Sequence, residues 1–113
     1  MSKLTFYKYQ GTGNDFIFLD NRQNQIDIPQ AAIQKLCHRR FGIGADGLVL
    51  IQLHASQDFE MIYYNADGSQ SFCGNASRCA THFAHYLGII KQSTRFMAID
   101  GVHEALIAEQ QIK

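Results

Sequence analysis

The sequence predicts a mixed α/β domain whose β-sheet is largely antiparallel or mixed, rather than doubly wound and parallel. Three observations support this class. Strand-like and helix-like segments follow each other in the order β-β-α-β-β-α-β-β, the connections are mostly short, and Asp100-Gly101 separates two apolar runs as in a β-hairpin. At 113 residues, of which 46% are hydrophobic, the chain fits one domain with a real core.

The first two elements are expected to be strands joined by a tight loop. Residues 3–9 and 16–19 are rich in β-branched and aromatic side chains. Between them, residues 11–15 read Gly-Thr-Gly-Asn-Asp, a run of strong turn formers. The fold should therefore open with a strand, a loop and a second strand.

A helix is expected next, over about residues 29–40. Pro29 suits a first turn, the side chains at positions 33, 36, 37 and 40 repeat at helical spacing, and Gly42 ends the pattern. The run at 42–47 literally matches G-x-G-x-x-G. A dinucleotide-binding fingerprint follows a strand and opens a helix, however, and this run does the reverse. We therefore interpret these glycines as loop residues.

Two further strands and a longer helix are expected in the middle of the chain. Residues 48–53 and 59–64 are short apolar runs bounded by polar residues or glycine, which is typical of strands. Apolar residues then recur at i, i+3, i+4, i+7, i+8 and i+11, which predicts a helix over 76–87 with one buried face. Gly88 suits the left-handed position that ends such a helix.

The last expected elements are the two strands of a hairpin, at residues 94–99 and 102–107, around the two-residue loop Asp100-Gly101. Polar residues 109–111 would form the next turn, and the sequence ends at position 113, where another strand should begin. We therefore expect these residues to be the front part of a longer protein.

Charge and composition favour a small-molecule partner. Ten Lys and Arg residues balance ten Asp and Glu residues, so the chain lacks the positive field that nucleic acid or an anionic membrane surface selects. The sequence shows no signal peptide and no membrane span. Its three cysteines are an odd number in a chain without secretory features, which favours reduced thiols and a cytoplasmic location.

Cys73 is the strongest candidate for a reactive group. It directly precedes the predicted helix, so its thiol should lie at a helix N-terminus, where free N–H groups and the positive end of the dipole favour an anion. In such surroundings the pKa of a cysteine thiol can fall from about 8.5 to roughly 3.5–7.5. Gly74 would let a ligand approach the backbone closely, so acid/base chemistry and carboxylate binding could share one spot.

Two other interpretations of this region stay open. Cys73 could be a small buried residue in a turn. Cys37 and Cys79 are expected to be core residues, because each shares a helical apolar stripe with core side chains. A metal site is the weaker alternative. Cys79, His82 and His85 drift around the helix instead of converging, and their spacing matches no closed zinc framework.

Two asparagines are candidate substrate ligands. A primary amide donates at one end and accepts at the other, so Asn14 and Asn65 could each bind both the carboxylate and the ammonium of an amino acid. Taken alone, each asparagine is more often a turn former than a ligand.

Four motifs, in this order, resemble the N-terminal half of the diaminopimelate epimerases. They are Gly-Thr-Gly-Asn-Asp-Phe at 11–16, Arg-Arg-Phe-Gly-Ile-Gly-Ala-Asp-Gly at 39–47, Asn-Ala-Asp-Gly-Ser at 65–69 and Cys-Gly-Asn-Ala-Ser-Arg-Cys at 73–79. The resemblance covers essentially the whole chain. Proline-racemase-like relatives of this fold carry Cys-Gly-His where this chain has Cys73-Gly74-Asn75, which favours the epimerases.

The resemblance implies two pseudo-symmetric α/β halves, each a mixed sheet wrapped around a central helix, with substrate held between them. Residues 1–113 would be the N-terminal lobe, and the C-terminal lobe would be its partner; a homodimer is a further option. The implied reaction is the epimerisation of LL- to meso-diaminopimelate for lysine and peptidoglycan precursors. It uses neither pyridoxal phosphate nor metal, and two cysteines act as acid and base on opposite faces of the α-carbon.

The same resemblance assigns roles to individual residues. Cys73 would be one of the two acid/base groups, and Asn14, Asn65, Gly74 and Asn75 would contact the substrate. Ala76 stands where the family usually has glycine, which would narrow the approach to the helix start. The second cysteine, its His and Glu partners and a Gly-Ser carboxylate site belong to the second half. We therefore expect the isolated chain to hold one face of the site and to have little or no activity.

Overall fold

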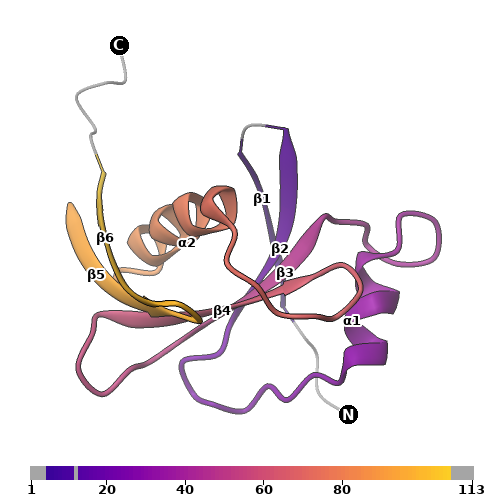
Figure 1. Cartoon of the computed structure of the whole chain (residues 1–113), viewed down its shortest axis with the longest axis horizontal. Coiled ribbons are helices and arrows are strands. Elements are labelled where there is room, and N and C mark those ends of the chain that lie inside the picture. The colour runs from indigo at the N-terminus through magenta and orange to yellow at the C-terminus, as the bar shows by residue number, and fades with distance from the viewer. Residues whose placement is uncertain (1–4, 12, 108–113) are drawn as a thin grey trace.

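The computed structural model describes residues 5–11 and 13–107 of the 113-residue chain. Within these residues, six strands form one sheet and two helices pack against it (Figure 1). In chain order the elements are β1 (Tyr7–Gly11), β2 (Asn14–Asp20), α1 (Gln30–Cys37), β3 (Gly47–Gln52), β4 (Phe59–Asn65), α2 (Gly74–Tyr86), β5 (Ser93–Ala98) and β6 (Gly101–Leu106). The strands lie side by side in sequence order, alternating between antiparallel and parallel pairs. The predicted element order and the mixed sheet are confirmed.

The two helices cover opposite faces of the sheet. Along β2, Phe16 and Phe18 pack on the side of α2, whereas Ile17 and Leu19 pack on the side of α1 with its Ile33. Because both faces are covered, β2 and β3 are nearly continuous apolar runs. Each helix also provides the crossover that a parallel strand pair requires. No helix in the described part of the chain is long and apolar enough to span a membrane.

α2 is the central helix. It lies within the curve of the sheet and packs against β1, β2, β3, β4 and β6 (Figure 1). Ala76, Ala80 and Ala84 are fully buried on its inner face, and their small side chains let the helix approach the strands closely. Phe83, also fully buried, contacts aromatic rings of β1 and β2. The helix ends before Gly88, whose φ of +83° confirms its predicted left-handed conformation.

α1 ends at Cys37, earlier than the predicted end at residue 40, because the loop that follows folds back onto the helix. Two N–H groups of this loop, those of Gly44 and Ala45, donate to the last carbonyls of α1 at 3.0 and 3.1 Å. These bonds replace the next helical turn. Gly42 lies so close to the helix that a Cβ there would be 1.9 Å from a carbonyl oxygen of α1. The run at 42–47 therefore leads from a helix into β3 as a loop, as interpreted from the sequence.

The first hairpin has a shorter loop than predicted. β1 pairs with β2 as far as Gly11 and Asn14, so most of the turn-forming run belongs to the strands. Gly13, with φ of +87°, takes the conformation that the loop requires. The strand begins at Tyr7, and the first residues of the predicted strand at 3–9 lie outside the described part of the chain.

The second hairpin is shifted by one residue from the prediction. Ala98 pairs with Gly101, so the loop is Ile99-Asp100 and not Asp100-Gly101. The positive φ falls on Gly101, at +124°, after the turn and not within it. The strands predicted at 48–53 and 59–64 agree closely with β3 and β4, whereas the turn predicted at 109–111 lies outside the described residues.

Candidate functional site

Cys73 is the N-cap residue of α2, which confirms its predicted position. Its backbone is extended (φ −130°, ψ 116°), its carbonyl accepts the first helical bond from Ser77 at 2.9 Å, and its side chain makes no capping bond. The first turn carries no acidic residue. A Cβ placed on Gly74 would meet nothing within 4 Å. The half-buried thiol therefore stands beside an open helix N-terminus that can accept an anion.

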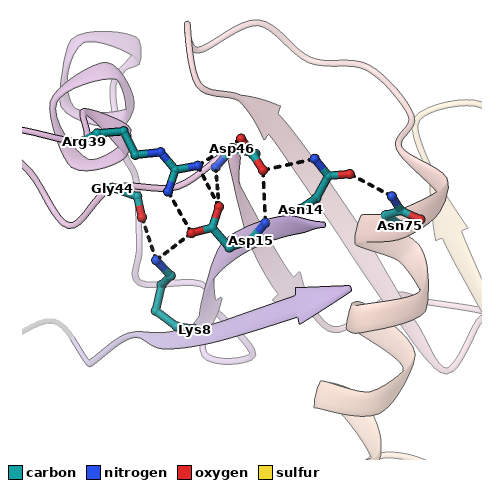
Figure 2. Close-up of polar contacts among 7 residues, drawn as sticks. All are labelled: Lys8, Asn14, Asp15, Arg39, Gly44, Asp46 and Asn75. Carbon is teal, nitrogen blue, oxygen red and sulfur yellow. Dashed lines mark hydrogen bonds and ion pairs between the residues drawn. The ribbon is translucent and has the colours of Figure 1, made fainter. Parts of the chain in front are cut away.

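Asn14 and Asn75 join the start of β2 to the first turn of α2 (Figure 2). The Asn75 side-chain amide donates to Asn14 Oδ1 at 2.7 Å, and the Asn14 amide donates to the Asp46 carboxylate at 3.0 Å. Asp46 also accepts from the backbone N–H of Asp15 at 3.1 Å. Because a carboxylate only accepts, it fixes which end of the Asn14 amide faces α2.

A network of charges holds Asp46 in place (Figure 2). Arg39 donates two bonds to Asp15, both at 2.8 Å, and one to Asp46 at 3.0 Å. Lys8 donates to Asp15 at 3.1 Å and to the carbonyl of Gly44 at 2.6 Å. The hydrogen bonds from Arg39, helped by Lys8, hold the pKa of Asp15 well below its usual range despite partial burial. Strand β1, strand β2 and the loop after α1 are thereby locked together.

Asn65 ends β4 and organises the loop that leads to Cys73. Its side-chain amide donates to the hydroxyls of Ser69 and Ser71, at 3.0 and 3.1 Å, and its backbone N–H donates to the Ser69 carbonyl at 2.7 Å. Strand pairing places Asn65 opposite Gly47. Both side-chain N–H groups of Asn65 are thus used within its own loop. Within the described residues, its side-chain oxygen accepts one long bond of 3.3 Å, from Ser71.

The structure thus unites some of the predicted site residues more closely than others. Cys73, Gly74 and Asn75 are consecutive at the start of α2, and Asn14 reaches them through its hydrogen bond with Asn75. The side chain of Asn65 instead bonds to the serines of its own loop.

Sequence reasoning missed Tyr63. This residue of β4 is 7% exposed, and it belongs to the core cluster against which Cys73 packs. Burial, and next the interaction with Cys73, raise the pKa of Tyr63 to about 12. The available signal was the alternation of β4, which turns Phe59, Met61 and Tyr63 toward α2. The charges of the Arg39 network were missed too, although Asp15, Arg39 and Asp46 lie inside the motifs at 11–16 and 39–47.

The other two cysteines are core residues, as predicted. Cys37 and Cys79 are 3% and 5% exposed, and burial raises the pKa of each thiol. All three cysteines are free thiols. Among residues 5–11 and 13–107, no group of three or more His, Cys, Asp or Glu side chains is arranged to hold a metal ion.

Solved structures with the same fold include a phenazine biosynthesis protein of the PhzF family from Bacillus anthracis. It matches with a TM-score of 0.70 and 15% identity over 96% of this chain and 37% of that one. Methylitaconate-delta-isomerase matches with a TM-score of 0.67 and 16% identity over 94% of this chain and 35% of that one. The sheet curved around α2 therefore defines the fold class shared by these proteins, of which this chain spans less than half the length.

Sequence comparison is more specific. The diaminopimelate epimerase family model matches residues 6–111. The diaminopimelate epimerase of Flavobacterium psychrophilum is 60% identical over 112 residues, covering 96% of this chain and 43% of that protein. The diaminopimelate epimerase of Chlorobaculum tepidum is 43% identical over 104 residues, covering 89% of this chain and 40% of that protein. The chain belongs to the diaminopimelate epimerase family, a family of isomerases, and spans less than half the length of these curated relatives.

Proposed function

We propose that the protein containing this chain interconverts LL- and meso-diaminopimelate, with Cys73 as one of two cysteine acid/base groups. The observation that carries this proposal is the position of Cys73, a thiol beside the open N-terminus of α2 in a chain of the epimerase family. We further propose that residues 1–113 form the N-terminal lobe and that a second lobe, outside these residues, supplies the other cysteine.

Two opposed groups are needed because epimerisation inverts one carbon. When a thiolate removes the α-proton, the carbon becomes planar, and the new proton must arrive from the other face. A single base would have to reach both faces, whereas Cys73 and a cysteine of the second lobe would each serve one. The α-proton is only weakly acidic, so fixed dipoles and exclusion of water must lower most of the barrier.

The helix start supplies the dipoles in this proposal. The free N–H groups after Cys73, at Gly74 and Asn75, would bind the substrate carboxylate and the negative charge that develops on it. In the described part of the chain, Asn75 Oδ1 accepts no hydrogen bond, so we assign it to the substrate ammonium. Asn14 would hold Asn75 in this orientation, and Asn65 would shape the loop before Cys73 while offering its carbonyl oxygen.

We place this reaction in the cytoplasm, in the supply of lysine and peptidoglycan precursors. Three free thiols suit a reducing compartment. Since the second acid/base group would lie outside this chain, we also propose that the isolated chain has little or no activity.

The direct test is epimerisation by the whole protein carrying Cys73→Ala. We expect turnover to fall by at least about 10²–10⁴-fold, the usual contribution of a general acid or base. Cys79→Ala is the matched control, because this cysteine lies on the same helix but in the core. It should keep near-parental turnover in the folded protein. Substantial turnover by the Cys73→Ala protein would refute the assignment.

Another isomerase or a non-catalytic domain of this fold is the alternative, since methylitaconate-delta-isomerase has the same fold. Thiol reactivity separates a catalytic lobe from a non-catalytic one. We expect mild alkylation near neutral pH to modify Cys73 well before Cys37 and Cys79, as followed by mass spectrometry. Equal or reversed rates would favour the non-catalytic domain. Turnover of diaminopimelate and of other candidate substrates by the whole protein separates a diaminopimelate epimerase from another isomerase of this fold.

A further inference from the structure

Gly47 and Tyr63 fit together at the base of the Cys73 site. A Cβ placed on Gly47 would lie 2.5 Å from Tyr63 Cε1 and 2.6 Å from its hydroxyl oxygen. Only a glycine therefore leaves room for the ring at this place. The ring is held from another side by Phe16, in edge contact with centroids 6.0 Å apart. The ring is thus confined from two sides, within the core cluster against which Cys73 packs.

The Cys73 thiol is the polar neighbour of the Tyr63 ring. Cys73 packs against the core cluster that contains Tyr63, and among the described residues its thiol is the group whose hydrogen bonding raises the pKa of the phenol. Since the pKa of Tyr63 is raised to about 12, the phenol keeps its proton throughout the physiological range. It is therefore a permanent donor, and a donor that faces sulfur stabilises the thiolate more than the thiol.

The other titratable groups that interact with this pair cannot replace the phenol. Cys79, six residues further along α2, interacts with Cys73 as a buried thiol, while Asp46 and Cys37 act on Tyr63. None of the three brings positive charge. Arg78, on α2 itself, is the positive group that acts on Cys79. The hydroxyl of Tyr63 is the donor that strand β4 contributes.

We propose that Tyr63 is a positioning residue that donates its phenolic O–H to the Cys73 sulfur, orients it and favours its thiolate form, with Gly47 keeping the space for the ring. This inference rests on the proposed acid/base role of Cys73 and adds to it a second residue, on the sheet, that prepares the thiol. It also gives Gly47 a role that loop conformation alone does not explain.

The test is the pH profile of Cys73 alkylation in this chain, for the parent and for Tyr63→Phe. Loss of one hydrogen bond to a charged acceptor should move the pH of half-maximal rate upward by about one unit. Tyr64→Phe is the matched control: it removes the same hydroxyl from the neighbouring residue, which packs on the opposite face against the α1 side of the core. Its profile should equal that of the parent.

A parent in which Cys73 reacts first, together with an unshifted Tyr63→Phe profile, would overturn the role of Tyr63 alone. A parent in which Cys73 reacts no faster than Cys37 and Cys79 would overturn both proposals.

A second measurement uses the parent chain alone and so does not depend on whether a variant folds. In the parent chain with isotope-labelled tyrosine rings, the NMR signals of Tyr63 should shift over the same pH range in which Cys73 becomes reactive. Tyr63 signals that do not change over that range would contradict the inference.

Discussion

The side-chain amide of Asn75 donates a 2.7 Å hydrogen bond to Asn14 Oδ1, across 61 positions of sequence. This bond links the first turn of α2 to the edge of the sheet that the Asp46 and Arg39 network braces. The start of α2, where Cys73 lies, is thereby fixed relative to β2.

We expect Asn14→Ala and Asn75→Ala to be coupled. Each should lower the free energy of unfolding by about 0.5–1.5 kcal/mol, because each leaves a half-buried amide without its partner. The double variant should cost less than the sum of the two, since both remove the same bond. Urea denaturation of the four proteins measures the coupling. Strictly additive losses would mean that the bond contributes nothing to stability.

Acid should destabilise the chain through Asp15. Its pKa in the folded state lies below the unfolded value of about 3.9, chiefly because Arg39 donates to it. The ionised carboxylate therefore adds stability at pH values above about 4, and this contribution is lost as the pH falls toward the lower folded-state pKa. Asp15→Asn should flatten the stability curve below about pH 5. Asp27→Asn, at an exposed position outside the network, should leave it unchanged, and a parental curve for Asp15→Asn would contradict the prediction.

Two glycine-to-alanine changes should separate folding from function. At Gly74 the added methyl group meets nothing within 4 Å, so the stability should stay the same or rise by about 0.4–1 kcal/mol. The methyl group would nevertheless obstruct the approach to the helix N–H groups, and kcat/KM of the whole protein should fall by about tenfold or more. Undiminished kcat/KM would contradict the assignment of this helix start to the substrate carboxylate.

Gly47→Ala should behave in the opposite way. The added methyl group would collide with Tyr63, and overpacking of this kind costs about 1–3 kcal/mol. The melting temperature should fall clearly, whereas that of Gly74→Ala should not. If the Gly47→Ala chain were as stable as the parent, the close fit of the tyrosine ring over this glycine would be disproved.

Local patterns were sufficient to predict most elements and the position of the thiol. The periodicity of α2 is that of a helix with one buried face, and Cys73 stands directly before it, so its N-terminal location follows from adjacent residues alone. Strand β4 was also predicted from adjacent residues, because it is a short apolar run between polar neighbours.

Features that depend on contacts between distant residues were not predicted. The end of α1 is set by hydrogen bonds from Gly44 and Ala45, and no propensity in the helix itself reveals them. The Asn14 to Asn75 bond and the contact of Tyr63 with Cys73 depend on strand order and register. A single sequence contains no direct signal for either.

The most direct measurement of the central claim is α-proton exchange by the whole protein in D2O. The parent should place deuterium at the α-carbon of diaminopimelate while it interconverts the LL and meso forms. Cys73→Ala should neither epimerise the substrate nor introduce deuterium, because one of the two proton-transfer groups is gone. Deuterium incorporation at the parental rate by Cys73→Ala would show that another group moves the proton and would contradict the account.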